Sequence, residues 1–231
     1  MTALRRVKAR SPSPQLVAVI SSPADLQQAT RLRHAPDFFE LRLDALCPLL
    51  PEAQRFIAKL AAPLIITARH PAEAGMHNLS PARRCELLLR YLPQADYVDI
   101  ELRSLAEMRP LLDATKHHGT PRIISVHDFR RTPSPEELRK MLDAARAAHA
   151  DVFKIVTRTD TDEDAAHLLE FFEQNKRRLA ISAMATGKLG REMRLTLARR
   201  GSVLNYVHLG TRQVEGQLSL AEMCRALKLR S

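Results

Sequence analysis

A lysine lies in the middle of an apolar segment, residues 151–156 (DVFKIV), whose composition predicts a buried strand. Burying an ammonium group costs several kcal/mol unless the group is paired or gives up its proton. A neutral lysine amine is a nucleophile whose natural target is a ketone or an aldehyde, with which it forms a Schiff base. Lys154 is therefore a candidate for covalent catalysis.

Four other β-branched segments carry polar groups on one face, because successive side chains of a strand point to opposite faces. These groups are Glu40 and Arg42, Thr67 and Arg69, Asp99 and Glu101, and Ser125 and His127. His127 suits proton transfer near neutral pH, and the arginines suit bidentate binding of a carboxylate. Together with Lys154, these residues indicate a metal-free lyase or aldolase that acts on an oxo-acid.

Eight apolar, β-branched segments recur along the chain and alternate with segments of helical spacing. They are residues 16–20, 38–44, 63–69, 97–102, 121–127, 152–157, 179–184 and 203–209. Several helical segments open with Ser-Pro, a favoured helix start, and residues 219–229 (SLAEMCRALKL) close the chain as an eighth helix. Such alternation is typical of βαβ units and a parallel sheet.

Eight units without a linker predict a single-domain (β/α)8 TIM barrel over residues 15–231, after a flexible basic tail at residues 1–14. An open doubly wound sheet is the alternative, but the first strand is followed by ISSPAD and not by a glycine-rich G-x-G-x-x-G turn. Functional residues of such barrels lie at the carboxyl ends of the strands. We expect a layer there of Glu40, Arg42, Arg69, Glu101, His127 and Lys154. Burial and the two arginines would favour the neutral amine of Lys154.

Composition excludes several other classes of protein. No run of 18 apolar residues predicts a membrane helix, and three widely spaced cysteines fit neither a zinc site nor a disulfide framework. The net charge of +10 raises the question of nucleic acid, but the basic residues are spread along the chain and Trp is absent. We expect a cytoplasmic homodimer with a small anionic substrate, without nucleic acid, membrane or cofactor as a partner.

Six motifs then occur in order: ELRLD (40–44), TARHPAEAG (67–75), SVHDF (125–129), DVFKI (151–155), GKLGREMR (187–194) and EGQLS (215–219). Each is weak alone, but their order and spacing resemble the type I 3-dehydroquinate dehydratases of the shikimate pathway. The resemblance runs from about residue 16 to residue 225. It implies dehydration of 3-dehydroquinate to 3-dehydroshikimate: imine formation at C3, proton removal from C2, loss of the C1 hydroxyl as water, and hydrolysis.

The resemblance also implies a role for each matching residue. Lys154 would form the Schiff base, His127 would carry protons, and Glu73 would orient and charge His127. Arg194 would bind the substrate carboxylate. The remaining substrate contacts would be Glu40, Arg42, Arg69, Gln213 and Gln217.

The last loop departs from the family pattern. A serine and an Ala-Pro pair are usual before the Gly-Gln, whereas here the stretch is Gln213-Val214-Glu215. Met193 also stands where serine is common, and Thr186 stands where methionine is common. These changes bear on turnover rate and loop closure, and they leave the Lys–His–Glu set intact.

Two alternatives belong to other classes. A different Schiff-base barrel, such as a sugar-phosphate aldolase, would use ATGKLG (185–190) as a phosphate-binding turn. Glu40-x-Arg42 and the pair Arg194 and Gln217 favour a polyhydroxylated carboxylate instead. A non-catalytic barrel that binds nucleic acid through its charge would reveal itself by salt-dependent binding.

Overall fold

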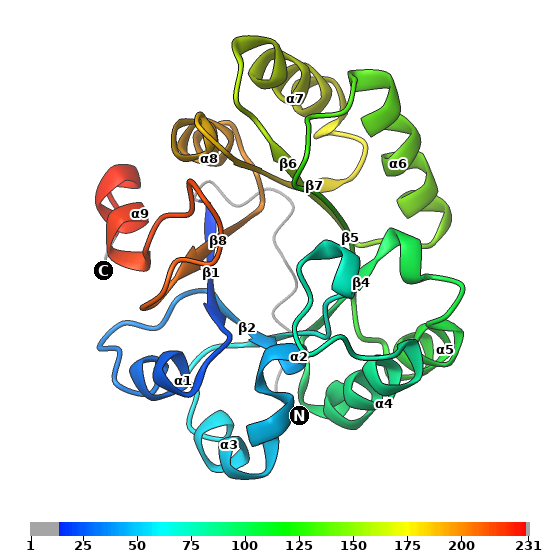
Figure 1. Ribbon diagram of the computed structural model, residues 1–231, viewed down its shortest axis with the longest axis vertical. Coiled ribbons are helices and arrows are strands. Elements are labelled where there is room, and N and C mark those ends of the chain that lie inside the picture. The colour runs from blue at the N-terminus through cyan, green and yellow to red at the C-terminus, as the bar shows by residue number, and fades with distance from the viewer. Residues whose placement is uncertain (1–13, 230–231) are drawn as a thin grey trace.

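The computed structural model describes residues 14–229, in which eight parallel strands surround a central axis and helices form an outer ring (Figure 1). The strands are β1 (Gln15–Ile20), β2 (Phe38–Arg42), β3 (Leu64–Thr67), β4 (Tyr97–Glu101), β5 (Arg122–Asp128), β6 (Val152–Arg158), β7 (Ala180–Thr186) and β8 (Leu204–His208). The α-helices are α1 (Pro23–Ala29), α2 (Leu43–Leu46), α3 (Leu50–Ile57), α4 (Pro81–Tyr91), α5 (Arg109–His118), α6 (Pro135–Ala147), α7 (Asp162–Asn175), α8 (Gly190–Arg199) and α9 (Leu220–Leu227). Four short 3₁₀ turns complete the list: η1 (Cys47–Leu49), η2 (Pro71–Glu73), η3 (Leu92–Gln94) and η4 (Leu102–Ser104). The predicted (β/α)8 barrel is confirmed.

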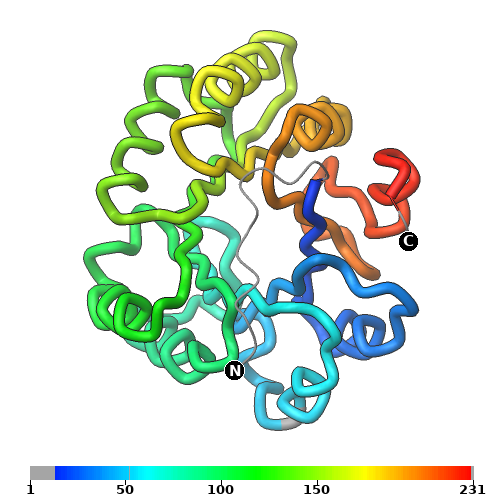
Figure 2. Tube along the Cα trace, turned by 180° about the vertical axis from the view of Figure 1, so that it is seen from behind, coloured from blue at the N-terminus to red at the C-terminus, as the bar shows by residue number. Residues whose placement is uncertain are grey.

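The first and last strands close the sheet on itself. β1 pairs with β2 on one side and with β8 on the other, and Figures 1 and 2 show β1 and β8 side by side from opposite directions. The described strand ladders run without a break from β8 through β1 to β7. At the remaining β7–β8 seam, Val203 N–H donates to the Ile181 carbonyl, and the Ser182 hydroxyl donates to the Leu204 carbonyl. The barrel is thus nearly closed.

Each predicted strand is present with ends within two residues of the prediction, and two of these differences move polar residues out of a strand. β2 stops at Arg42, so Asp44 lies on α2, and β3 stops at Thr67, so Arg69 lies in the loop that follows. The C-terminal helix expected as the eighth is α9, because two α-helices follow β2. The second of these begins at Leu50 with Pro51 in its first turn, and a proline cannot donate the hydrogen bond that would continue the preceding helix. The predicted tail lies outside the described residues apart from Pro14.

Local sequence explains where the helices begin. Ser22, Ser80 and Ser134 precede a proline, and each serine hydroxyl accepts a main-chain N–H from the first turn. Thr161 and Ser219 cap α7 and α9 in the same way, each with an acidic residue that reaches back to the cap. These caps fix the loops that connect each strand end to the next helix, which is where the mouth of the barrel lies.

The strand side chains divide into an outer and an inner set. The outer set packs against the helices and forms the larger apolar core, with Phe39, Leu41 and Phe153 among its fully buried members. The inner set begins at the amino ends of the strands with a floor of apolar residues: Val17, Phe38, Ile65, Tyr97, Ile123, Val152 and Leu204. Because the period of a strand is two, the next inward residues lie one layer nearer the mouth, and several of them are charged.

One layer above the floor is formed by alternate strands. Glu40, Asp99, Lys154 and Tyr206 come from β2, β4, β6 and β8 and are all at least 96% buried. Barrels of this class fill their interior with layers of four side chains from alternate strands. Here three of the four positions carry an ionisable carboxyl or amine, so a layer that usually packs the core is instead polar. We call these four residues the polar layer.

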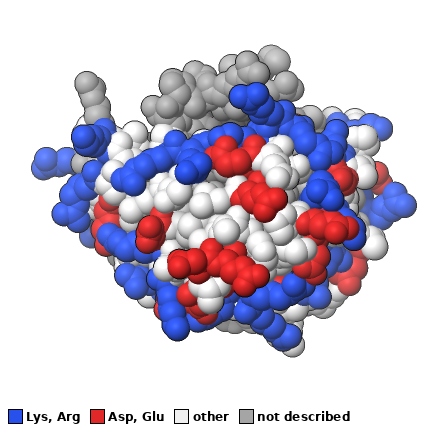
Figure 3. Space-filling model, turned by 90° about the horizontal axis from the view of Figure 1, so that it is seen from above, with Lys and Arg blue, Asp and Glu red and all other residues white. Residues whose placement is uncertain are grey.

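The charged surface side chains are mixed in sign on the face drawn in Figure 3. Lys and Arg lie around its rim, while Asp and Glu gather between them. No helix in the described range is long and apolar enough to span a lipid bilayer.

Candidate active site

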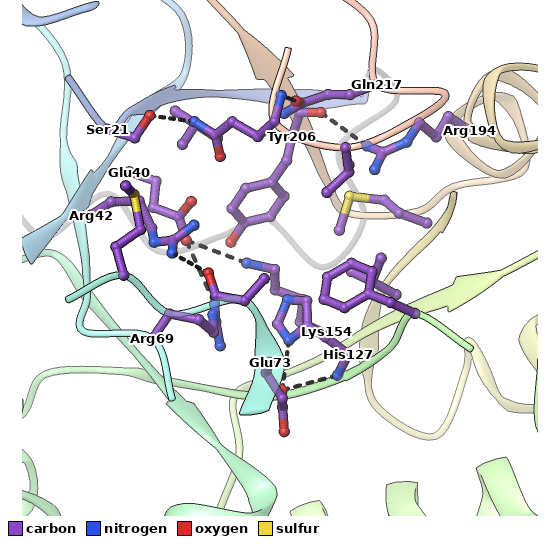
Figure 4. A pocket seen from close by; sticks show the side chains of 18 residues that line it. Ser21, Glu40, Arg42, Arg69, Glu73, His127, Lys154, Arg194, Tyr206 and Gln217 are labelled. Carbon is purple, nitrogen blue, oxygen red and sulfur yellow. Dashed lines mark hydrogen bonds and ion pairs between the residues drawn. The ribbon is translucent and has the colours of Figure 1, made fainter. Parts of the chain in front are cut away.

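The nine residues predicted as site residues all line one cavity of about 330 Å³ at the carboxyl ends of the strands (Figure 4). They are Glu40, Arg42, Arg69, Glu73, His127, Lys154, Arg194, Gln213 and Gln217. Segments as distant as β2 and the loop after β8 thus contribute to one space. The structure brings these nine side chains together, and their roles stay predictions.

Lys154 is held by the other members of the polar layer. Its Nζ lies 2.9 Å from Asp99 Oδ2 and 3.3 Å from Glu40 Oε1, and 3.7 Å from the centre of the Tyr206 ring. Thr67 Oγ1 donates to the same Glu40 oxygen at 2.8 Å. The nitrogen is therefore fixed between two carboxylates and an aromatic face, with the cavity beside it.

This geometry corrects the expected surroundings of Lys154. The sequence suggested a lysine crowded by Arg42 and Arg69, but both arginines have carboxylate partners of their own. Arg42 makes a two-fold hydrogen bond with Asp44, at 3.0 and 2.8 Å, and also donates to the Ala74 carbonyl. Lys154 is thus an ion-paired lysine, and the predicted attack on a carbonyl would first require it to release a proton.

Arg69 is enclosed by acceptors behind the polar layer. Its two terminal nitrogens donate to both oxygens of Asp99, at 3.0 and 2.9 Å, and Nη1 also donates to Glu101 and Ser125. Burial by itself would raise the pKa of Asp99, but the charges of Arg69 and Lys154 outweigh it and hold the pKa below its usual value. Asp99 is therefore a carboxylate that links the lysine to the arginine.

Glu101 was expected in the mouth layer, and this expectation was wrong. Its carboxylate is not among the groups that line the cavity and instead accepts from Arg84 of α4 at 2.9 Å, from Ser104, and from the main-chain N–H of His70. Arg84 is 1% exposed. Glu101 thus anchors the β3–α4 loop, which carries Glu73, from behind the site.

These groups form one charge-balanced cluster, which we call the buried ion cluster. Its buried members are three cations (Arg69, Arg84 and Lys154) and three carboxylates (Glu40, Asp99 and Glu101), joined by ion pairs of 2.9–3.9 Å. Arg84 also pairs with Glu107, which is 44% exposed. None of the six side chains is more than 4% exposed. Since a buried charge is tolerated only with a partner, equal numbers of each sign explain how six charges lie inside one barrel.

Glu73 and His127 form a separate pair on the other side of Lys154. Glu73 Oε2 lies 2.8 Å from His127 Nδ1 and also accepts the main-chain N–H of His127 at 3.0 Å. Burial raises the pKa of Glu73 to about 7. Burial, together with the charges of Arg69 and Lys154, lowers the pKa of His127 well below 6.5.

The two contacts fix the form of the imidazole. Oε2 of Glu73 accepts the main-chain N–H of His127, so it is an acceptor and not a donor. We therefore place the proton of the neutral imidazole on Nδ1, from which it is donated to Oε2. His127 is then neutral near pH 7, with its Nε2 lone pair free. His127 lies two residues beyond Ser125, which is opposite Lys154 in the β5–β6 ladder, so the ring stands over the lysine at the mouth (Figure 4).

Arg194 is a buried cation with a different environment. It is 4% exposed, and burial lowers its pKa to about 10. It donates to the main-chain carbonyls of Ala185 in β7 and Tyr206 in β8, and no carboxylate lies within ion-pair distance of it in the described part of the chain. Two of its five N–H donors are thus engaged by neutral carbonyls, and its positive charge is unpaired.

The loop after β8 crosses the mouth and is tied on three sides. Gln217 Oε1 accepts the main-chain N–H of Gln213, and Gln213 Nε2 donates to Ser21 Oγ at 2.6 Å. Glu215 makes an ion pair of 3.6 Å with Arg158 at the end of β6. Gly216 has φ 79°, and a Cβ there would lie 2.8 Å from the Cα of Gly190, so only glycine allows the loop to pack this closely on α8.

The 187–190 turn offers no open cradle for a phosphate. The main-chain N–H groups of Lys188, Leu189 and Gly190 already donate to Asp160, to the Thr159 carbonyl and to the Gly187 carbonyl. A Cβ at Gly187 would meet the Asp160 carboxylate. The turn is therefore closed by protein acceptors, one of them negatively charged.

Two residues that sequence reasoning did not assign also belong to the site. Asp99 was placed on the polar face of its strand but received no role, and Tyr206 was not considered. Alternation with Leu204 would have placed Tyr206 inside the barrel, which is the signal that was available. Among the described residues, no group of three or more His, Cys, Asp and Glu side chains is arranged to hold a metal ion.

The fold and the site together define a class: (β/α)8 barrels with a lysine on the sixth strand beside a histidine–glutamate pair. The family model of type I 3-dehydroquinase matches residues 17–231. The chain belongs to the type I 3-dehydroquinase family.

Individual relatives agree with this assignment. The chain is 31% identical over 222 residues to the 3-dehydroquinate dehydratase of Methanococcoides burtonii, covering 94% of each chain. It is 32% identical over 229 residues to that of Methanosarcina acetivorans, covering 93% of each. Among solved structures, the 3-dehydroquinate dehydratase of Aquifex aeolicus superposes with a TM-score of 0.75 at 27% identity, covering 93% of this chain and 97% of that one. That of Enterococcus faecalis gives 0.79 at 26%, with 94% and 93% covered.

Proposed function

We propose that this chain dehydrates 3-dehydroquinate to 3-dehydroshikimate through a Schiff base on Lys154, a step of the shikimate pathway towards chorismate and the aromatic amino acids. The activity of the curated relatives supports the reaction. The observation that carries the mechanism is the placement of Lys154 Nζ beside a neutral His127 in a cavity that also contains the unpaired cation Arg194.

Substrate binding would use the positive charge of Arg194, which is unpaired among the described residues. The substrate carboxylate pairs with Arg194, whose remaining N–H donors suit a carboxylate and whose charge has no carboxylate partner among the described residues. Glu40 and Arg42 line the opposite wall and hold the ring hydroxyls. A substrate bound in this way would have its ketone between Arg194 and the β2 side, above Lys154.

His127 carries the protons of each step. It first carries two protons from the Lys154 nitrogen to the C3 oxygen, one before and one after the amine adds to C3. This oxygen leaves as water, the protonated imine forms, and His127 is neutral again. His127 then removes a proton from C2, which the protonated imine acidifies, and returns it to the C1 hydroxyl as that group leaves as water. The carboxylate of Glu73 keeps Nε2 facing the substrate and stabilises the imidazolium while it exists.

The β8–α9 loop completes the site. Gln213 and Gln217 line the cavity from above, and closure of such a loop excludes water from the reaction. The sugar-phosphate aldolase alternative has no supporting observation, because the 187–190 turn has its N–H groups engaged. A cytoplasmic homodimer that binds no nucleic acid remains our prediction.

The experiment is covalent trapping in parallel with an activity assay. The protein is incubated with 3-dehydroquinate, formation of the product enone is followed by absorbance, and a second sample is reduced with sodium borohydride and digested. We expect one adduct, on the peptide that contains DVFKIV. A Lys140→Met variant, which removes an exposed lysine of α6, should form the same adduct. Enone formation without an adduct, or an adduct on another peptide, would contradict the mechanism.

A further inference from the structure

The hydroxyl of Tyr206 has no hydrogen-bond partner among the described residues, although it is buried. Tyr206 is 3% exposed and lines the cavity. A buried hydroxyl without a partner loses the hydrogen bonds it would make to water, so such groups are uncommon and call for an explanation. A ligand oxygen in the cavity would supply the missing partner.

The position of the ring indicates which part of a ligand this hydroxyl would meet. Lys154 Nζ stands 3.7 Å from the ring centre, and the hydroxyl points to the space between Lys154 and Glu40 (Figure 4). A carbon that bonds to Nζ approaches from the cavity, which Tyr206 also lines, and the oxygen attached to that carbon then comes close to this space. The hydroxyl is thus beside the oxygen of the group that Lys154 attacks.

A second tyrosine of the same chain, Tyr91, shows whether a buried hydroxyl without a partner is by itself a sign of a site. The hydroxyl of Tyr91 on α4 is also buried and unpartnered in the described structure, but Tyr91 is not among the residues that line the cavity. An unpartnered tyrosine hydroxyl alone is therefore no sign of a site. Tyr206 differs because it lines the cavity and its ring lies against Lys154, 3.7 Å from Nζ.

We propose that Tyr206 is a further catalytic residue, whose hydroxyl donates a hydrogen bond to the ketone oxygen of the substrate while Lys154 adds to the ketone carbon. This inference rests on the proposed Schiff-base function. Tyr206 lies outside the six motifs on which the family resemblance rests, so the role is inferred from the geometry of this chain. The phenol keeps its own proton, since burial and the nearby carboxylates of Glu40 and Asp99 raise its pKa well above 10.

The step balances without any other reactant. His127 takes one proton from the ammonium, the nitrogen lone pair forms the N–C bond, and the C=O π pair moves to oxygen, where Tyr206 stabilises the developing charge. The imidazolium of His127 protonates that oxygen and becomes neutral. The neutral imidazole then takes a proton from nitrogen and gives it to the hydroxyl as that group leaves as water. Ammonium and ketone thus give a protonated imine and one water.

The test compares Tyr206→Phe with Tyr91→Phe in the full chain. Each protein is mixed with 3-dehydroquinate, reduced with borohydride after timed delays, and the adduct on the Lys154 peptide is measured by mass spectrometry. Loss of one hydrogen bond should slow adduct formation in Tyr206→Phe about tenfold. Tyr91→Phe should match the wild type. Urea unfolding should show that neither variant is less stable than the wild type, since each loses an unpartnered hydroxyl.

The outcomes are distinct. An adduct that forms in Tyr206→Phe at the wild-type rate would overturn the role of Tyr206 and leave the proposed function standing. Equal slowing in both variants would overturn it too, because the effect would then reflect packing in general. A wild-type protein that turns over substrate but forms no adduct would overturn the Schiff-base mechanism and this inference with it.

Discussion

Removal of Lys154 should destabilise the protein as well as inactivate it, because Lys154 is one of three cations in the buried ion cluster. Lys154→Met leaves Arg69 and Arg84 against three carboxylates, all nearly inaccessible to solvent. Taken from the sequence alone, the same variant would be expected to fold normally. The structure changes that expectation.

The magnitude follows from the ion pairs that are lost. Breaking a buried pair by removing one partner costs about 3–5 kcal/mol, since it leaves a buried charge uncompensated. Asp99→Asn should cost a similar amount, because Asp99 holds both Lys154 and Arg69. The double variant has two cations and two carboxylates and is balanced again. Its free energy of unfolding should exceed the additive value by about 2–3 kcal/mol.

The assay is urea unfolding of the wild type, the two single variants and the double variant at pH 7. Lys140→Met is the matched control, because it removes a lysine from an exposed ion pair with Glu136 and should change stability by less than about 1 kcal/mol. Strictly additive effects of Lys154→Met and Asp99→Asn would refute the idea that the cluster is stabilised by its charge balance.

Three further predictions follow from single groups. Glu73→Gln removes a carboxyl whose pKa in the folded protein, about 7, lies above its usual 4.5. As pH rises from about 4.5 to 7, the free energy of unfolding of the wild type should fall by on the order of 3 kcal/mol relative to that of the variant. Curves of unfolding free energy against pH that run parallel for the two proteins would contradict the raised pKa. Arg194→Met should raise KM roughly 10- to 100-fold in steady-state kinetics, since charged hydrogen bonds to the substrate carboxylate are lost, and an unchanged KM would exclude Arg194 from binding. Gln217→Ala releases the main-chain N–H of Gln213 and should raise KM more than it lowers kcat; a collapse of kcat at constant KM would give the loop a part in the chemistry.

Much of the site was predictable because strand alternation is a local property. The inward faces of β2 to β6 follow from period-two patterning, and the alternation of strands with helices is enough to indicate the barrel. Glu73 and Arg194 were reached only through resemblance to a family, since a carboxylate in a loop and an arginine on a helix have no local pattern that distinguishes them from surface residues.

The partners of Lys154 were not predictable from strand ends, and barrel geometry explains why. The ladders place Lys154 opposite Ser125, and Ser125 opposite Glu101. Strands of an eight-stranded barrel are tilted, with a shear of about one residue per strand, so positions at equal height shift by two residues over two strands. Lys154 therefore meets Asp99 and not Glu101. This stagger is a property of the closed sheet and is absent from any single segment.

Arg194 links the binding role proposed for it to the β7–β8 seam. Its guanidinium bridges the carbonyls of Ala185 and Tyr206, at the junction where the strand ladder is interrupted. An anion that pairs with Arg194 also holds that bridge in place, so occupancy of the mouth and integrity of the seam are thermodynamically linked. Substrate should therefore slow amide hydrogen exchange in β7 and β8 more than in β3 and β4. By the same linkage, bound substrate should stabilise the β7–β8 seam, where the strand ladder is interrupted.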